Sequence, residues 1–129
     1  MIFGIGTDIL GIERIERIYQ RHGRRFAEHM LLPLEAEGFF NDARPARFLA
    51  MRFAAKEAIV KAMGTGFAQG MWIRDTGVAP NAWGRPEIIW SERGRAMCEK
   101  LGIGAGHITL SDEAGLVVAV AVLMRKAST

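Results

Sequence analysis

The sequence predicts an α+β fold in which a mostly antiparallel sheet packs against one long helix. Two observations favour this class. Apolar residues recur at helical spacing in residues 11–22, 47–63 and 91–101, and strand-like segments bounded by turn signals occupy both ends of the chain. The chain has 129 residues, 50% of them hydrophobic, which is enough to bury one core, and it contains no repeat or linker. We therefore predict a single domain over residues 1–129.

The N-terminal segments predict one strand followed by several helices. Residues 2–9, with the sequence IFGIGTDI, indicate a short buried strand because apolar residues run up to a polar end, and Asp8 is expected where the strand stops. Residues 11–22 indicate an amphipathic helix, since isoleucines recur at helical spacing beside a mainly basic face. Residues 24–41 indicate shorter helical pieces interrupted by Pro33.

The long helix predicted over residues 47–63 carries two charged residues one turn apart, Glu57 and Lys61. Phe48, Ala55 and Ile59 fall on one side of this helix, but the side that bears Glu57 is also rich in apolar residues. A helix that is apolar on two sides is usually covered on both. We therefore expect Glu57 and Lys61 in a cleft or at a subunit boundary rather than on an open surface.

The second half of the chain predicts a hairpin, a helix and two further strands. Residues 71–80 and 87–90 read as strands joined by a turn, and Ser91 is expected to cap a helix that ends at Leu101. HITLSD and, after a turn, the apolar segment 116–124 read as strands, the latter suited to the interior of a sheet. The tryptophans are expected in the core: Trp72, Trp83 and Trp90.

Composition bears on the location of the protein and on whether it binds membranes or nucleic acid. The single cysteine, Cys98, cannot form an internal disulfide, which favours a reducing, cytoplasmic location. No run of about 18 apolar residues is present, and the N-terminus lacks the features of a signal peptide, so neither a membrane segment nor export is expected. The formal net charge of +3 is too small to indicate nucleic-acid binding by itself.

Asp8 and Glu57 are the candidate metal ligands. One lies at the predicted end of a buried strand and the other in a buried helix, and two converging carboxylates suit Mg²⁺, which prefers oxygen ligands. Two other interpretations remain open at this stage. Asp8 could cap the following helix, and Glu57 could form an i,i+4 pair with Lys61.

The glycine pair after the long helix has two interpretations. Gly64 suits a helix C-cap, whereas a phosphate-binding loop would place its glycines before a helix, where N–H groups are free. Any phosphate bound here would need a cation such as Lys61 or Arg52. His107 could ligate a metal, contact phosphate or form a core hydrogen bond, but zinc is not indicated because no second ligand lies at suitable spacing.

Arginines gather on the first helix and just beyond it. Arg14, Arg17 and Arg21 share the helix, and Arg25 follows beside Phe26. They form either a solvated basic face or a surface that docks an acidic partner or phosphates. The second possibility keeps open a small basic RNA- or polyanion-binding module without catalysis as an alternative function.

Several segments together resemble the bacterial holo-acyl-carrier-protein synthases, the small type of 4′-phosphopantetheinyl transferase. They recur in the family's order and spacing over nearly the whole chain, and the combination is far more specific than the GTG alone. The matching segments are IFGIGTDI ending in Asp8, RFLAMRFAAKEAIVKAMGTG with Glu57 and Lys61, Gly70 and Asp75, GRP at residues 84–86, and HITLSDE before the last apolar strand.

The resemblance implies Mg²⁺-dependent transfer of the phosphopantetheine arm of coenzyme A to a serine of apo acyl carrier protein, in fatty acid biosynthesis. Adenosine 3′,5′-bisphosphate would be released, and a homotrimer would carry active sites at its subunit boundaries. By the same resemblance, Asp8 and Glu57 bind the metal, Lys61 holds phosphate oxygens, and Glu57 accepts the serine proton directly or through water. The implied coenzyme A contacts are Arg52, Lys61, Gly64, Thr65, Gly66, Pro86 and His107.

The resemblance also gives the basic helix a partner, because acyl carrier proteins are small and acidic. Arg14, Arg21 and Arg25 would steer and orient the carrier, with Ile18 and Phe26 as apolar anchors. No nucleic-acid or membrane partner is implied. Asp112 stays outside the catalytic set, because members of the family carry either a histidine or an acid at this position.

Overall fold

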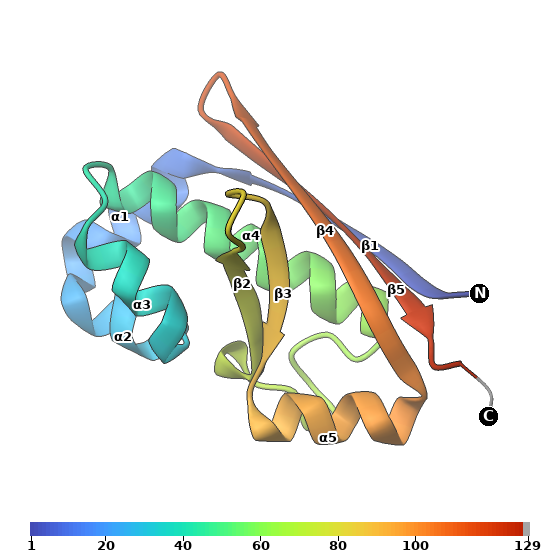
Figure 1. The fold of residues 1–129 in the computed structure, drawn as a ribbon. Coiled ribbons are helices and arrows are strands. Elements are labelled where there is room, and N and C mark those ends of the chain that lie inside the picture. Colours follow the sequence, from blue (N-terminus) through green and yellow to red (C-terminus); the bar gives the residue numbers. More distant parts are fainter. Residues whose placement is uncertain (128–129) are drawn as a thin grey trace.

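The computed structural model describes residues 1–127 and confirms the predicted α+β class. Helix α4 (Pro45–Met63) runs through the middle of the molecule (Figure 1). A three-stranded sheet and a two-stranded sheet together wrap around this helix, and strand β4 lies beside strand β3 where the two sheets meet. The core therefore forms around one long helix, as the periodicity of residues 47–63 predicts.

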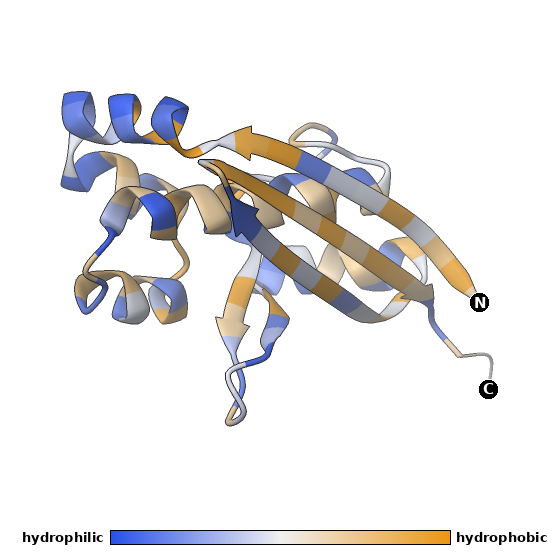
Figure 2. Ribbon diagram, turned by 90° about the horizontal axis from the view of Figure 1, so that it is seen from above, coloured by the Kyte–Doolittle hydropathy of each residue, from blue (hydrophilic) through white to orange (hydrophobic). Residues whose placement is uncertain are grey.

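The three-stranded sheet is antiparallel with the order β1-β5-β4. Its strands are β1 (Ile2–Gly11), β4 (Ile103–Glu113) and β5 (Leu116–Arg125). The central position of β5 confirms the prediction from its apolar sequence, and Figure 2 shows it as an almost continuously hydrophobic strand. The predicted end of the first strand was wrong. β1 continues beyond Asp8, which pairs with Ala119 inside the ladder, because β5 supplies a partner as far as Gly11.

The helices follow the predicted order. They are α1 (Ile12–His22), α2 (Arg24–Met30), α3 (Pro33–Phe40), α4 and α5 (Glu92–Leu101). Pro33 begins α3, where its missing N–H costs nothing, and Ser91 caps α5 by accepting a hydrogen bond from the Gly94 N–H. Within residues 1–127, no helix has both the length and the apolar character needed to cross a bilayer.

The predicted hairpin forms, but its first strand is shorter than expected. It consists of η1 (Ile73–Asp75), a short 3₁₀ turn, followed by β2 (Thr76–Pro80) and β3 (Pro86–Trp90). The start of the predicted strand turns instead because the Asp75 carboxylate accepts the backbone N–H of Trp72 at 2.9 Å. This hydrogen bond closes the turn and sets the direction in which β2 begins.

The expectation of three core tryptophans was wrong for two of them. Trp83 is 93% exposed in the turn between β2 and β3, and Trp72 is 65% exposed just before η1. Trp90 is half-buried and packs against the core. The prediction failed because a tryptophan in a turn is as hydrophobic in sequence as one in the core. The turn nevertheless directs its side chain toward solvent.

A buried ion pair joins α3, α4 and β2. The Lys56 ammonium, 0% exposed, donates to Glu35 Oε1 at 2.7 Å and to the Thr76 carbonyl oxygen at 2.6 Å. The Glu35 carboxylate also accepts the backbone N–H groups of Leu32 and Val78. Burial lowers the pKa of Lys56, and the Glu35 charge opposes that shift. Each charge is therefore partnered, and removal of one would leave the other buried without compensation.

We expect Glu35→Ala to lower the free energy of unfolding by about 3–5 kcal/mol, because it leaves a buried ammonium and two backbone N–H groups without their carboxylate acceptor. Urea denaturation of the purified protein measures this. Glu99→Ala is the matched control. It breaks the exposed Lys126–Glu99 pair, whose atoms lie 2.6 Å apart, and should cost less than about 1 kcal/mol. Equal losses from both variants would contradict the structural role of the buried pair.

Candidate functional site

The close approach of β1 to α4 positions the site. Gly4, Gly6 and Asp8 occupy every second position of β1 and therefore lie on the same face of the strand. A Cβ atom built on Gly4 would lie 2.0 Å from the Ala62 carbonyl oxygen, and one on Gly6 would lie 2.0 Å from that of Ala58. The two glycines therefore allow the strand backbone to lie directly against the helix. Asp8, the next residue on the same face, is held beside α4.

The structure brings together the three residues predicted to carry catalysis. The Lys61 ammonium donates to the Thr7 carbonyl oxygen at 3.0 Å and to Asp8 Oδ1 at 3.2 Å. Lys61 thus pairs with Asp8 across the two elements, and not with Glu57 along the helix as one interpretation of the sequence had it. The helix-capping interpretation of Asp8 was also wrong, because Gly11 is the N-cap of α1 and no side chain caps this end.

Glu57 lies close enough to Asp8 for the two charges to interact. Its pKa is raised, first by burial and then by the negative charge of Asp8, while Lys61 and Arg14 oppose the shift. Two carboxylates that repel each other in a partly buried position form a site that a cation would stabilise. Arg14 extends the influence of α1 to this carboxylate, so the basic helix borders the cluster.

The donor set fits Mg²⁺ better than a transition metal. It offers carboxylate oxygens only, and among residues 1–127 no three His, Cys, Asp or Glu side chains gather into a site that could hold a metal alone. Mg²⁺ is commonly bound by one or two carboxylates and completes its octahedral shell with waters and substrate phosphates. A cavity of about 390 Å³ beside Asp8 and Lys61 leaves room for such ligands.

Arg52 lies in a different cavity, of about 530 Å³, together with Arg47 and Glu35. Its guanidinium stacks over the Phe48 ring, 4.3 Å from the centroid, and burial lowers its pKa. The Arg52 Nε atom is buried without a hydrogen-bond partner and lies 3.7 Å from Glu35 Oε2. A buried donor with unused hydrogen-bonding capacity, at the edge of a cavity, is suited to an anion.

Pro86 and His107 lie together in a third cavity, of about 510 Å³, formed by β3 and β4. His107 is opposite Val122, which is opposite Ile5, so the three residues form one row across the sheet. This row belongs to the sheet face that points away from α4. Ile5, Ile9 and Val118 are 58%, 66% and 38% exposed on that face. An apolar β-sheet face of this kind is typical of an interface with another chain.

The turn from Gly64 to Gly66 is a helix C-cap. Gly64 has φ of 82°, and its N–H donates to the Lys61 carbonyl oxygen. The N–H groups of Thr65 and Gly66 both donate to the Val60 carbonyl oxygen. The C-cap interpretation is confirmed, and these backbone donors are already used by the helix. Any contact of this turn with a phosphate would come from other groups.

Asp112 forms an ion pair with Arg47 and so has a structural role. Arg47 Nε and Nη2 donate to the two carboxylate oxygens of Asp112, each at 2.8 Å. The Arg47 guanidinium lowers the pKa of this carboxyl group. The pair ties the end of the β4–β5 hairpin to the start of α4.

The sequence reasoning missed Lys56 and Glu35. Lys56 follows Leu49 and Phe53 at helical spacing and precedes Val60 and Met63 on the same stripe. A lysine within an apolar stripe indicates a buried cation with a partner, and this signal was available. The identity of the partner was not, because Glu35 lies on another helix and has no distinguishing pattern.

The predicted partner-binding residues share a surface on α1 and α2. Arg14, Arg21 and Arg25 are exposed, whereas Ile18 and Phe26 are half-buried and pack against the core. Figure 2 shows α1 as mostly hydrophilic. The surface thus combines exposed charges with apolar side chains that are partly packed into the core.

Comparison with known proteins shows similarity over nearly the full length. A model of the 4′-phosphopantetheinyl transferase superfamily matches residues 4–121. The holo-[acyl-carrier-protein] synthase of Halorhodospira halophila is 43% identical over 124 residues, 96% of this chain and 98% of the relative. The crystal structure of the Neisseria meningitidis holo-[acyl-carrier-protein] synthase has a TM-score of 0.92 and 38% identity, covering 97% of this chain and 100% of that chain. The Helicobacter pylori protein of the same name, solved in complex with coenzyme A, has a TM-score of 0.81 and 28% identity, covering 92% and 98%.

We expect Gly6→Ala to disrupt the carboxylate cluster, because its Cβ would lie 2.0 Å from the Ala58 carbonyl oxygen and force β1 away from α4. The free energy of unfolding should fall by about 1–3 kcal/mol or more, as in an overpacked core. Gly11→Ala is the matched control on the same strand, since its Cβ would have no neighbour within 4 Å. Thermal unfolding compares the variants, and a Gly6→Ala protein as stable as Gly11→Ala would refute the close contact.

Proposed function

We propose, since the chain belongs to the 4′-phosphopantetheinyl transferase superfamily, that it is a holo-[acyl-carrier-protein] synthase in fatty acid biosynthesis. It transfers the phosphopantetheine group of coenzyme A to a serine hydroxyl of apo acyl carrier protein. The serine oxygen forms a bond to the phosphorus that bears the pantetheine arm, and the bond from this phosphorus to the bridging oxygen breaks. Adenosine 3′,5′-bisphosphate leaves. The observation that carries the proposal is the Asp8–Glu57–Lys61 cluster in a chain similar to such synthases over nearly its whole length.

Asp8 and Glu57 are the proposed Mg²⁺ ligands. Their mutual repulsion in a partly buried position, and an all-oxygen donor set, support this choice of ion. When bound, Mg²⁺ neutralises negative charge that develops on the pyrophosphate oxygens during transfer. Mn²⁺ also accepts hard oxygen ligands of this kind.

Glu57 and Lys61 have further proposed roles in the transfer. Lys61 reaches across from α4 with a half-exposed ammonium, and it can exchange its contact with Asp8 for a phosphate oxygen. Glu57 accepts the serine proton, directly or through a water molecule. Partial burial raises the pKa of this carboxyl group, which makes the carboxylate a stronger base.

The remaining coenzyme A contacts are proposed to come from a neighbouring subunit. Arg52 on one side, and Pro86 with His107 on another, lie in cavities separate from the cavity of Asp8 and Lys61. The apolar outer face of the sheet supports an assembly in which a second copy covers this face and brings the cavities together. We propose a homotrimer, as the family resemblance implies, with Gly64–Gly66 near the bound coenzyme A.

The acidic carrier is proposed to dock on α1 and α2. Arg14 lies near Glu57, as its effect on the pKa of that carboxyl group indicates, so a carrier bound to this helix would reach the cluster. Arg21 and Arg25 would orient it, and Ile18 and Phe26 would provide apolar contacts. Family membership favours this partner over RNA or another polyanion. We further propose one domain over the chain and a cytoplasmic location.

The transfer reaction itself is tested by mass spectrometry of apo acyl carrier protein incubated with the protein, coenzyme A and Mg²⁺. We expect the carrier to gain the mass of one phosphopantetheine group, and EDTA to abolish the gain. Asp8→Asn should reduce the rate at least about 100-fold, the scale of losing one group that stabilises transition-state charge. Glu113→Gln, which removes an exposed carboxylate at the end of β4, should leave the rate unchanged. Full activity of Asp8→Asn would exclude the proposed metal site.

The docking surface is tested separately with the double variant Arg21→Ala/Arg25→Ala. Loss of two exposed charges should raise KM for the acidic carrier by about tenfold and leave KM for coenzyme A unchanged, since rim charges act mainly on association. Arg17→Ala is the control, an exposed arginine on α1 that pairs with Glu13. Steady-state kinetics at several salt concentrations distinguishes the variants. If Arg17→Ala raises KM as much as the double variant, the carrier is attracted by net charge and not by this surface.

A further inference from the structure

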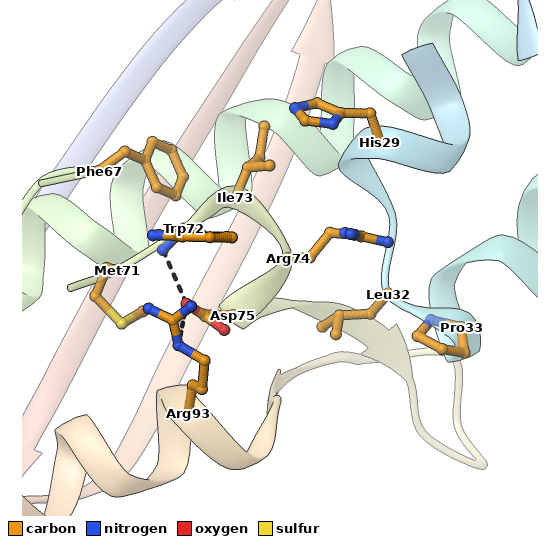
Figure 3. Close-up of a pocket in the computed structure, with 10 residues that line it drawn as sticks. All are labelled: His29, Leu32, Pro33, Phe67, Met71, Trp72, Ile73, Arg74, Asp75 and Arg93. Carbon is orange, nitrogen blue, oxygen red and sulfur yellow. Dashed lines mark hydrogen bonds and ion pairs between the residues drawn. The ribbon is translucent and has the colours of Figure 1, made fainter. Parts of the chain in front are cut away.

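A cavity of about 770 Å³ contains none of the residues predicted to bind metal, coenzyme A or the carrier. Its walls come from the end of α2, the start of α3, the segment after α4, the η1 turn and the first residues of α5 (Figure 3). Asp8 and Lys61 lie in another cavity, on β1 and α4. The volume falls within the range of roughly 300–1,000 Å³ that is usual for small-molecule sites.

The interior of this cavity is mainly apolar. Leu32 and Met71 are buried, and Phe67 and Ile73 are half-buried and pack against the core. These side chains are part of the packed core or contact it directly. The cavity is therefore preformed and can bury an apolar group without first ordering its own walls.

Trp72 stands at the edge of the cavity with its ring held in place. The Arg93 guanidinium lies 4.4 Å from the ring centroid, and the Trp72 backbone N–H donates to Asp75 at 2.9 Å. Figure 3 shows the indole between Phe67 and Arg93. The ring is nevertheless 65% exposed, so much of this large aromatic side chain faces water. Such a ring provides a ready surface for a ligand to cover.

The charges of the lining leave one cation without an acidic partner. Asp75, the acidic residue of the cavity, accepts the Ser91 hydroxyl at 2.7 Å as well as the Trp72 N–H, and Arg93 Nε lies 3.8 Å away. Arg93 also donates to the Gly70 carbonyl oxygen. Among residues 1–127, Arg74 takes part in no ion pair within 4.0 Å, and Figure 3 shows its side chain extending between His29 and Leu32.

We infer that this cavity binds a small amphiphilic carboxylate, a molecule with an alkyl or aryl body and one carboxylate group. The body would lie on Leu32, Met71 and Ile73 and cover the Trp72 ring, while the carboxylate would meet the Arg74 guanidinium. A pyrophosphate is a poorer fit, because it would need several free hydrogen-bond donors. The arginines of this cavity supply one unpaired charge, that of Arg74. The inference does not depend on the proposed transfer reaction, because neither coenzyme A nor metal is part of the site.

The test is a titration of ¹⁵N-labelled protein with octanoate, followed by NMR in the absence of coenzyme A and Mg²⁺. We expect saturable binding that shifts the Trp72 indole N–H signal most, this signal being assigned by its loss in Trp72→Phe. Octan-1-ol, which lacks the charge, should bind at least about tenfold more weakly, as expected for a lost charge-assisted hydrogen bond. Arg74→Ala should weaken octanoate to the same extent, and Ile73→Trp, which fills the cavity, should also weaken it.

Arg17→Ala is the matched control, because it removes another exposed arginine, one outside the cavity, and should leave octanoate affinity unchanged. Equal affinity for octanoate and octan-1-ol would overturn the inference, since the site would then recognise no charge. It would also be overturned if Arg74→Ala bound octanoate as well as Arg17→Ala, or if the Trp72 signal did not move. None of these results bears on the transfer reaction, which is measured in a separate assay.

Discussion

The contact between β1 and α4 is the constraint on which the rest of the structure depends. Gly4 and Gly6 carry no Cβ, so the strand backbone touches the helix backbone at Ala62 and Ala58. Two consequences follow from this one contact. The sheet is anchored to the helix at the centre of the core, and Asp8 is brought within reach of Lys61 and Glu57 without any loop in between. A site built on a strand and a helix keeps its geometry better than one built on loops.

Two adjacent residues of helix α4, Lys56 and Glu57, carry opposite charges in different surroundings. Lys56 points into the core, where its ammonium pairs with the Glu35 carboxylate and donates to the Thr76 carbonyl oxygen. Glu57, the next residue, remains half-buried, and the positive charges of Lys61 and Arg14 offset only part of the rise in its pKa. The buried pair of Lys56 and Glu35 fixes the rotation of the helix about its axis. Turning the helix would expose Lys56 and bury Glu57. That rotation directs Glu57 toward β1, so a structural ion pair sets the orientation of the proposed catalytic carboxylate.

The distribution of cavities explains why a single copy looks incomplete. Arg52 has an unused buried donor in one cavity, and His107 occupies another on the apolar outer face of the sheet. Burial of that face against a second copy would remove exposed isoleucines from water and could bring these residues to the Asp8 cluster. The cavity at Trp72 lies outside this arrangement, since its walls come from α2, α3, η1 and α5.

The sequence by itself determined the fold class, the long helix and the central strand, and it singled out Asp8, Glu57 and Lys61 as candidates, because periodicity and short motifs are local signals. It did not determine which of the three residues pair. Lys61 faces Asp8 rather than Glu57 because a strand far away in the chain lies closer to its ammonium than the preceding helical turn does. The partner of Lys56 was hidden for the same reason. Tertiary structure alone decided these pairings, because a contact between two distant segments produces no periodic pattern in the sequence of either segment.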